Sequence, residues 1–317
     1  MKVSKKTVTG KKRGFFKKLI ERDQLEILSM TLPVFVQVFI FCYLPMLGVI
    51  VAFKNYKTSK GIFGSEWVGF KNFEFFFRSN DAKRVISNTL FYNAMFITLG
   101  IIGAVFLAIL LSMITQKISL KVFQTTMLFP HFMSWVVVAY MALTFLDYKS
   151  GFLNMWITKL GGEAISWYSE PKWWPMILVI IQLWKIIGNN SLVYYAAIIG
   201  VDSELYESAS LDGCSPWQQI WYIMLPMIRP TIITLAIMAI GNIFRADFGL
   251  FFNVPQNSGS LIKATDVIDT YIYRTLFVTG DVGISSAVGL VQSIVGFILV
   301  VTTNKVVKRL EPEMGLF

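Results

Sequence analysis

The amino-acid sequence predicts an all-α integral membrane protein with six membrane-spanning helices. Of its 317 residues, 55% are hydrophobic and only 15% are charged, which makes the chain far more apolar than a soluble globular protein. The apolar residues gather in six runs, each long enough for the roughly 20 residues that one bilayer crossing needs. No polar block between these runs is long enough to fold alone, so we expect one transmembrane domain.

The six predicted spans divide the chain into three parts. A basic segment covers residues 1–25, the transmembrane domain covers residues 26–304, and a tail covers residues 305–317. Within the domain, the spans run over Leu28 to Phe53, Val85 to Ile114, Val122 to Leu146, Trp174 to Ile199, Met227 to Phe251 and Val282 to Thr303.

The charge distribution predicts the orientation of these spans. The formal charge is +10, and nine of the 29 Lys and Arg residues precede Asp23, ahead of the first span. Such a cluster favours anionic lipid and cytoplasmic retention over nucleic acid. The first span is too long for a cleavable signal and lacks a small-residue cleavage pattern. We therefore expect a multi-pass protein of the bacterial plasma (inner) membrane, with both termini in the cytoplasm and no nucleic-acid partner.

The first external loop, residues 54–84, is rich in aromatic side chains. Aromatic residues at this density favour the membrane interface. Two interpretations stay open: a short amphipathic helix on the outer leaflet, or a docking surface for an external partner. The aromatic residues are Phe63, Trp67, Phe70, Phe73, Phe75, Phe76 and Phe77.

Small residues mark the helix faces that we expect to pack closely. Gly100, Ala104 and Ala108 recur every four residues in the second span, which lets another backbone approach. The last span carries a similar face. It consists of Gly283, Ala287, Gly289 and Gly296.

A polar island over residues 202–225 separates the fourth and fifth spans. Asp202 or Ser203 can cap a helix, because their oxygens accept from the free N–H groups of its first turn. Asp212-Gly213 ends that helix, since glycine tolerates left-handed geometry. Ser215-Pro216 opens a second helix. We expect two short helices at an angle, the second presenting Trp217, Trp221 and Tyr222. Residue physics alone leaves a passive hairpin and a plug for another protein equally open.

The spacing within the island carries a family resemblance. The pattern Glu207-Ser-Ala-x3-Gly213-x9-Ile-x-Leu-Pro226 resembles the EAA motif of bacterial ABC importer permeases, with Ser208 in place of an alanine. Stretches near Trp67, Phe129 and Asp269 look like carbohydrate-uptake permeases, in the complex-oligosaccharide subgroup that includes permeases named for lipoproteins and for alginate import. The resemblance covers nearly the whole chain.

This resemblance implies the type I importer fold, with the island as a cytoplasmic coupling helix between spans 4 and 5. It implies a heterodimer with a second permease, two ATPase subunits that bind ATP and Mg, an extracytoplasmic sugar-binding protein and an oligosaccharide substrate. The implied ATPase-coupling residues are Glu207, Ser208, Ala209, Asp212, Gly213 and Pro226. The implied contacts with the binding protein are Trp67, Gly69, Asn72 and Phe73.

The sequence gives no reason to expect an enzyme, a cofactor or a metal in this chain. No G-x-x-x-x-G-K-[ST] phosphate loop occurs, so energy must come from a partner. His131 is the only histidine, and we expect it to be structural. Cys42 and Cys214 have no metal-ligand or disulfide spacing.

Polar residues inside the spans predict a substrate pathway, because they are costly in lipid and face a protein interior or a wet cavity. Gln182, Lys185 and Asn189 share one face of the fourth span, and Asn242 and Arg245 lie three apart in the fifth. They suit a hydroxyl-rich or anionic sugar. Bonds between helices, or an ion pair with Asp247, are the alternative.

A secondary transporter or channel that needs no ATPase is the competing hypothesis. It would be favoured by inverted repeats or by discontinuous helices at the membrane midplane, and the sequence indicates neither.

Overall fold

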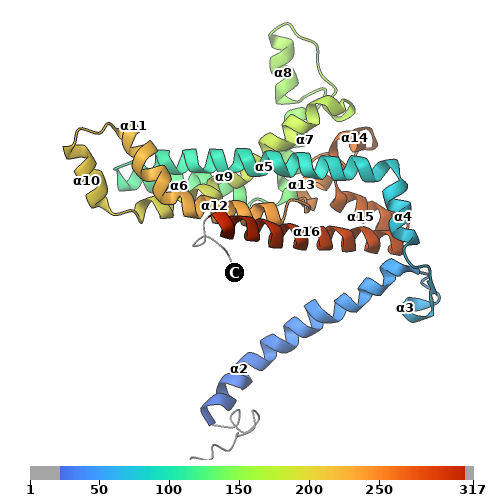
Figure 1. Ribbon diagram of the computed structural model, residues 1–317. Helices are drawn as coiled ribbons and strands as arrows, with labels where there is room; N and C mark the ends of the chain where they lie inside the picture. The colour runs from blue at the N-terminus through green and yellow to red at the C-terminus, as the bar shows by residue number, and fades with distance from the viewer. Residues whose placement is uncertain (1–21, 311–317) are drawn as a thin grey trace, which may run out of the picture. The chain divides into compact units, whose positions relative to one another are not determined.

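The computed structural model describes residues 22–310, which form an almost wholly helical protein (Figure 1). Within these residues, five helices are long and apolar enough to cross a membrane, and a bent pair raises the number to six if it counts as one span, in agreement with the predicted spans. The basic segment predicted over residues 1–25 lies mostly outside the described part. Residues 311–317 of the predicted tail also lie outside the described part, whereas residues 305–310 continue the last helix.

The chain divides into two compact units, residues 1–51 and 52–317. The first unit holds α2 (Arg22–Val38), a π turn η1 (Phe39–Tyr43) and most of the 3-10 helix η2 (Leu44–Phe53). Pro45 has no N–H to donate, which fits the departure from α geometry around it. Together these turns form the predicted first span.

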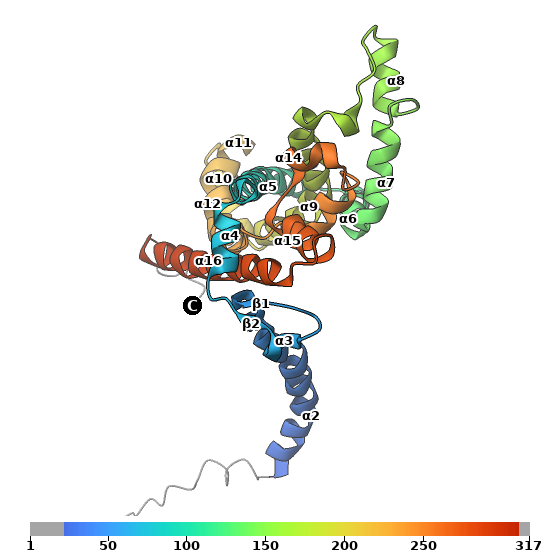
Figure 2. The same ribbon diagram turned by 90° about the vertical axis from the view of Figure 1, so that its right-hand side faces the viewer.

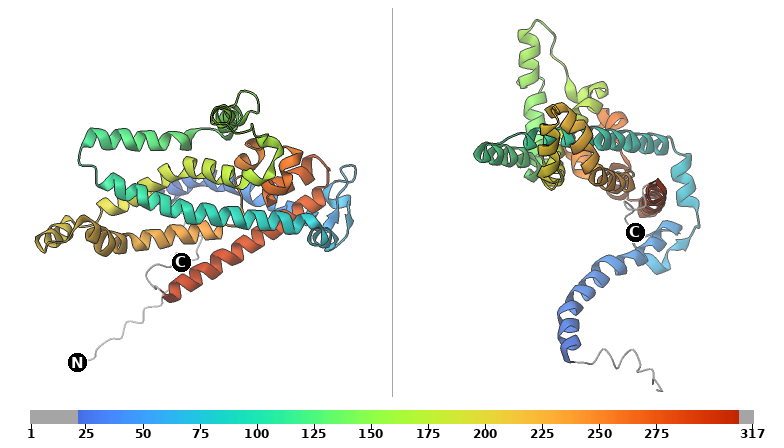
Figure 3. Two further views of the ribbon diagram at one scale, coloured as in Figure 1. Left: turned by 90° about the horizontal axis from the view of Figure 1, so that it is seen from above. Right: turned by 60° about the vertical axis from the view of Figure 1, so that its left-hand side comes forward.

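The second unit is built around α5 (Asn80–Ser112) and α9 (Trp174–Ile199), which pack side by side with α12 (Leu225–Gly241), as Figure 3 shows. Gly100, Ala104 and Ala108 are buried, which confirms the predicted packing face of α5. A side chain at Gly188 would collide with the backbone of Met127. The small residues therefore allow the helix backbones to approach closely.

The third predicted span is broken. α6 (Lys117–Phe132) and α7 (Trp135–Leu146) meet at an angle of 95°, so the expectation of one continuous helix over 122–146 is wrong. Ser134 caps the new helix, because its Oγ accepts from the N–H of Val137. α7 then leads to α8 (Phe152–Lys159), which projects from the rest of the second unit (Figure 2).

The fifth predicted span differs at both ends. Its helix starts at α11 (Pro216–Gln219), passes through a π turn η5 (Ile220–Met224) and continues as α12 to Gly241. The prediction of a short second helix in the island is therefore wrong, because α11 is the beginning of a 26-residue helix. An irregular loop, residues 242–247, follows before α13 (Phe248–Asn253).

The end of the second unit opposite α11 collects the short elements (Figure 1). They include an antiparallel hairpin in which Lys54 pairs with Trp67. The short elements are β1 (Lys54–Asn55), α3 (Gly61–Gly64), β2 (Glu66–Trp67), α4 (Lys71–Arg78), η3 (Trp167–Ser169), η4 (Pro171–Trp173), η6 (Gly259–Leu261), α14 (Ile262–Thr265) and α15 (Ile268–Phe277). The last predicted span follows them as α16 (Val282–Leu310).

One face of α5 fastens this end of the unit. The guanidinium of Arg84 and that of Arg274 both donate to the fully buried carboxylate of Asp266. Asn88 donates to the backbone oxygen of Asp266 at 2.8 Å, and the hydroxyl of Tyr92 donates to that of Ala264 at 2.7 Å. Because these α5 residues are spaced by four, they lie on one side of the helix. α14 and α15 are thereby attached to α5.

Candidate functional site

The polar island folds as a helical hairpin of α10 (Ser203–Leu211) and α11, and its local geometry follows the sequence prediction. Asp202 Oδ1 accepts from the N–H of Glu204 at 3.0 Å, which caps α10. Gly213 has φ +80° and ends it. Ser215 and Gln218 form a reciprocal capping box, with Pro216 in the first turn.

The hairpin presents its motif residues on an exposed surface. Glu207, Ser208, Asp212 and Gly213 are exposed, and Leu211 is 90% exposed. Pro226, at the start of α12, is also exposed. The aromatic residues Trp217, Trp221 and Tyr222 point outward as well, while Ile220 and Met224 on the same helix are buried. A large exposed apolar surface of this kind marks a contact with another molecule.

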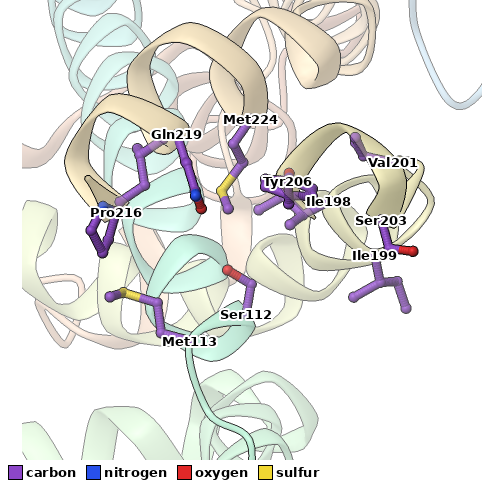
Figure 4. Close-up of a pocket in the computed structure, with 11 residues that line it drawn as sticks. Ser112, Met113, Ile198, Ile199, Val201, Ser203, Tyr206, Pro216, Gln219 and Met224 are labelled. Carbon is purple, nitrogen blue, oxygen red and sulfur yellow. The ribbon is translucent and has the colours of Figure 1, made fainter. Parts of the chain in front are cut away.

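A cavity of about 430 Å³ lies between α10, α11 and the end of α5 (Figure 4). Tyr206 and Ile198 line it on one side, and Pro216 and Gln219 on the other. Burial raises the pKa of the Tyr206 phenol, and among the described residues its hydroxyl has no hydrogen-bond partner. Gln219 Nε2 donates to Ser210 Oγ at 2.9 Å and joins the two helices. The hairpin is thus braced across the cavity, and beside it Tyr206, Ile220 and Met224 pack on a hydrophobic cluster from α5 and α9.

A second group of polar residues lies where the helices break. Lys185 on α9 is 8% exposed, and its ammonium donates to the backbone oxygens of Pro130, His131 and Met133 at the end of α6. The Pro130 oxygen also accepts from the N–H of Met133, and all three oxygens lie at the negative end of the helix dipole, which attracts a cation. Lys185 therefore satisfies the broken end of α6.

Trp135 connects the two breaks. Its ring lies 5.0 Å from the ammonium of Lys185, and its indole N–H donates to Asp247 at 2.8 Å. Asp247 in turn accepts from the N–H groups of Gly249 and Leu250 and caps α13. A side chain at Gly249 would overlap the Trp135 ring. The break in the third span and the break in the fifth are therefore held by one chain of contacts.

Side-chain amides hold the loop 242–247. Asn93 on α5 donates to the oxygens of Ile243 and Arg245 at 2.8 and 3.1 Å. Gln292 on α16 donates to the oxygen of Phe244, and Asp269 accepts from the N–H of Ala246. Irregular backbone inside a membrane persists only where its polar groups are satisfied or a cavity is wet. The surrounding helices therefore hold the loop 242–247 in a defined conformation.

The predicted pathway residues do not share one environment. Asn242 and Arg245 are exposed on the loop, whereas Lys185 is buried and bonded. Gln182 and Asn189 are half-buried, and the Gln182 Oε1 atom is buried without a partner among the described residues. The prediction missed Asn93, Asp269 and Gln292. Asn93 and Gln292 lie inside spans, so the same rule on intramembrane polar residues would have found them.

The predicted docking residues near the β1–β2 hairpin also lie in different environments. Trp67 is 62% exposed, and Gly69 has φ +62° with open space around it. Asn72 donates to the backbone oxygens of Ala52 and Lys54, so its amide is used within the fold. The ring of Phe73 packs 5.2 Å from that of Phe53.

A family model described as "Binding-protein-dependent transport system inner membrane component" matches residues 97–314. The chain belongs to this family. It is a membrane permease subunit of a binding-protein-dependent transporter, as the resemblance of the sequence implied.

Relatives of this permease cover nearly its full length. It is 35% identical over 298 residues to protein LplB of Bacillus subtilis, covering 94% of this chain and 92% of the relative. It is 32% identical to the polygalacturonan/rhamnogalacturonan transport system permease protein YteP of Bacillus subtilis, covering 96% and 93%.

A solved structure is similar in fold as well as in sequence. The bacterial ABC transporter involved in the import of the acidic polysaccharide alginate matches with a TM-score of 0.85 and 31% identity, covering 93% of this permease and 99% of that chain. The same transporter in complex with its alginate pentasaccharide-bound periplasmic protein matches with a TM-score of 0.84. The type I importer permease fold predicted from the sequence is confirmed.

Proposed function

We propose that this permease is one membrane half of an ATP-driven importer of acidic oligosaccharides. Two cytoplasmic ATPase subunits, which bind ATP and Mg, would hold the α10–α11 hairpin, and a second permease would complete the pathway. An extracytoplasmic sugar-binding protein would deliver the substrate at the α4 and α15 end. The termini would then lie in the cytoplasm.

The observation that carries this proposal is the geometry of the hairpin in a member of this family. Glu207 is exposed one turn from Leu211, and Gly213 ends α10 without strain. Such a slim, rigid projection fits insertion into a cleft on a soluble partner. ATP-driven closure of that partner would move the hairpin and, through α12, the loop 242–247.

The proposed sugar pathway passes the loop 242–247. Its exposed Arg245 offers a guanidinium that can form paired hydrogen bonds with a carboxylate, and Asn242 offers an amide. Gln182 and Asn189 on α9 would add amides. The names of two relatives, for alginate and for polygalacturonan, support an acidic sugar. Lys185 would act by holding α6 rather than by touching sugar.

The proposed docking of the binding protein at the β1–β2 hairpin rests on exposed aromatic residues. Trp67 and Phe70 are 62% and 73% exposed, and their rings pack around Phe53. We propose that Trp67 makes the contact, that Gly69 shapes its turn, and that Asn72 and Phe73 support it from below. An interfacial lipid contact for α4 is compatible with this role.

Reconstitution tests the energy source. The permease, coexpressed with its genomic neighbours and placed in vesicles, should take up an oligosaccharide only when the ATPase subunits and ATP are present. Uptake without any ATPase subunit would instead establish the secondary transporter or channel. The broken helices are a feature that the competing hypothesis would also show, and the family match is what supports the ATP-driven importer over it.

The charge of the substrate has its own test. Arg245→Gln should raise the half-saturating concentration of a galacturonate oligosaccharide about tenfold, the effect of losing one charge-assisted hydrogen bond. Uptake of a neutral glucose oligosaccharide should change little. Equal losses for both sugars would contradict a carboxylate contact.

A further inference from the structure

A small cavity of about 230 Å³ lies between α7 and the end of α13. It is smaller than the roughly 300–1,000 Å³ of pockets that hold drug-sized molecules. Tyr140 lines it from α7, and Phe252, Asn253, Gln256 and Asn257 line it from α13 and the turn that follows. Its lining residues on α7 follow Trp135 along that helix, and those on α13 follow the Asp247 cap.

The polar groups of this cavity are neutral and available. Asn253 Nδ2 and Gln256 Nε2 donate to backbone oxygens of their own segment. Within the described part of the chain, the side-chain oxygens of Asn253 and Gln256, the amide of Asn257 and the hydroxyl of Tyr140 have no partner. The cavity thus offers both donors and acceptors without a net charge.

An aromatic stack backs the same cavity. The ring of Phe252 lies 4.9 Å from that of Phe248, nearly parallel to it, and 4.8 Å from that of Tyr273. Tyr273 continues the stack to Phe277 at 4.8 Å. Phe252 is therefore fixed in place by its neighbours, while Tyr140, which is 63% exposed, lines the cavity from α7.

The turn that carries the amides is held in an unusual conformation. Gln256 and Asn257 have φ of +56° and +47°, a region that residues other than glycine rarely adopt. Tyr168 holds the turn at two points. Its hydroxyl donates to the backbone oxygen of Val254, and its backbone oxygen accepts from the hydroxyl of Ser260. Strained backbone of this kind persists where the surrounding fold imposes it. Both amides are kept at the cavity.

We propose that this cavity is an outer subsite that holds a single sugar ring of the substrate before it reaches the loop 242–247. Hydroxyl groups pair with neutral amides, and the apolar face of the ring packs on Phe252. An acyl chain would leave the amides unpaired, and a metal ion would lack a carboxylate. The proposal rests on the proposed function of sugar import and adds a site to it.

Glycine substitutions isolate the amides. Gln256→Gly with Asn257→Gly removes both side chains, and glycine adopts the left-handed conformation without strain. Gly259→Ala, in the same turn region, is the matched control, because an added Cβ meets nothing within 4 Å. Phe252→Leu removes the aromatic face and keeps an apolar side chain.

Binding is measured on the full-length permease in nanodiscs by saturation-transfer NMR, with digalacturonate and cellobiose as probes. Wild type and Gly259→Ala should bind at least one sugar through its ring protons. The double glycine variant should bind about tenfold more weakly, the effect of losing two neutral hydrogen bonds partly replaced by water. Phe252→Leu should lose the transfer to ring C–H protons. Equal binding by the double glycine variant, or no binding of either sugar by wild type, would overturn the subsite.

Uptake by the complete transporter separates this inference from the proposed function. If wild type imports an oligosaccharide and the double glycine variant has an unchanged half-saturating concentration, the subsite is wrong and the importer stands. If binding depends on the amides but no sugar is imported with ATP, the subsite stands and the importer is wrong.

Discussion

At the scale of single residues, the same side-chain chemistry serves different tasks according to its partners. Lys185 and Arg245 are both cations near the helix breaks. The ammonium of Lys185 is surrounded by three backbone oxygens and a tryptophan ring, whereas Arg245 is exposed on the loop. Their proposed roles therefore differ: Lys185 holds the broken end of α6, and Arg245 is exposed where we propose that the sugar passes.

Lys185→Met should destabilise the permease by about 3 kcal/mol, because it removes the charged donor that three backbone oxygens at the end of α6 share. Lys185→Arg keeps the charge and should retain part of the stability. Thermal unfolding of the purified protein in nanodiscs measures both. A Met variant with unchanged stability and lost sugar binding would show that Lys185 contacts substrate instead.

At the scale of elements, the sequence predicted the features that depend on near neighbours. The caps of α10 and α11 join residues two or three positions apart, and Asp202, Gly213 and Ser215 act as expected. The breaks depend on distant partners. Lys185 reaches Pro130 across 55 positions, and Asn93 reaches Ile243 across 150. Apolar periodicity continues through both breaks, so it predicted unbroken spans.

The island also shows why the candidate site was only partly predictable. Its spacing identified the motif residues, because the motif is local. The second helix was expected to be short, a separate element within the loop 202–225. Pro226 instead lies in the first turn of α12, where its missing N–H costs little beside the π turn before it.

Gly213→Ala tests the island as an element. A side chain at φ +80° costs about 1–2 kcal/mol, so the end of α10 should shift and ATPase activity should lose part of its dependence on substrate and binding protein. Glu207→Ala should have the same effect by removing the anion. The measurement is the ratio of stimulated to basal ATPase activity in the reconstituted transporter.

Gly259→Ala serves as the control, since its backbone needs no positive φ. Both island variants should still reach the membrane in normal amounts. Unchanged uptake and unchanged stimulation in both would rule out the island as the contact with the ATPase.

At the scale of the whole molecule, α5 is the frame of the second unit, to which other elements of that unit attach. It packs along α9, holds α14 and α15 through Arg84, Asn88 and Tyr92, and holds the loop 242–247 through Asn93. The end of the unit with α14 and α15, and the loop 242–247, are thus both held by one long helix. The family assignment came from sequence, but this arrangement required the structure.

Asn93→Leu and Asn88→Leu form a matched pair, because each removes an amide that donates to two backbone oxygens. Each should lower stability by about 2 kcal/mol in thermal unfolding. Only Asn93→Leu should also alter uptake, because it frees the loop 242–247. Equal effects of the two variants on uptake, at matched amounts of folded protein, would mean that the loop has no special role.

The unbroken helix from Pro216 to Gly241 has a mechanical consequence. With 26 residues at about 1.5 Å each, it is a rod roughly 39 Å long. A tilt of about 5° at one end then moves the other by about 3 Å, roughly the length of a hydrogen bond. The bonds from Asn93 and Gln292 to the loop, each between 2.7 and 3.1 Å, cannot stretch that far. We therefore expect a small rotation at the island either to carry α5 and α16 along or to break these bonds, which favours discrete positions of the permease over gradual bending.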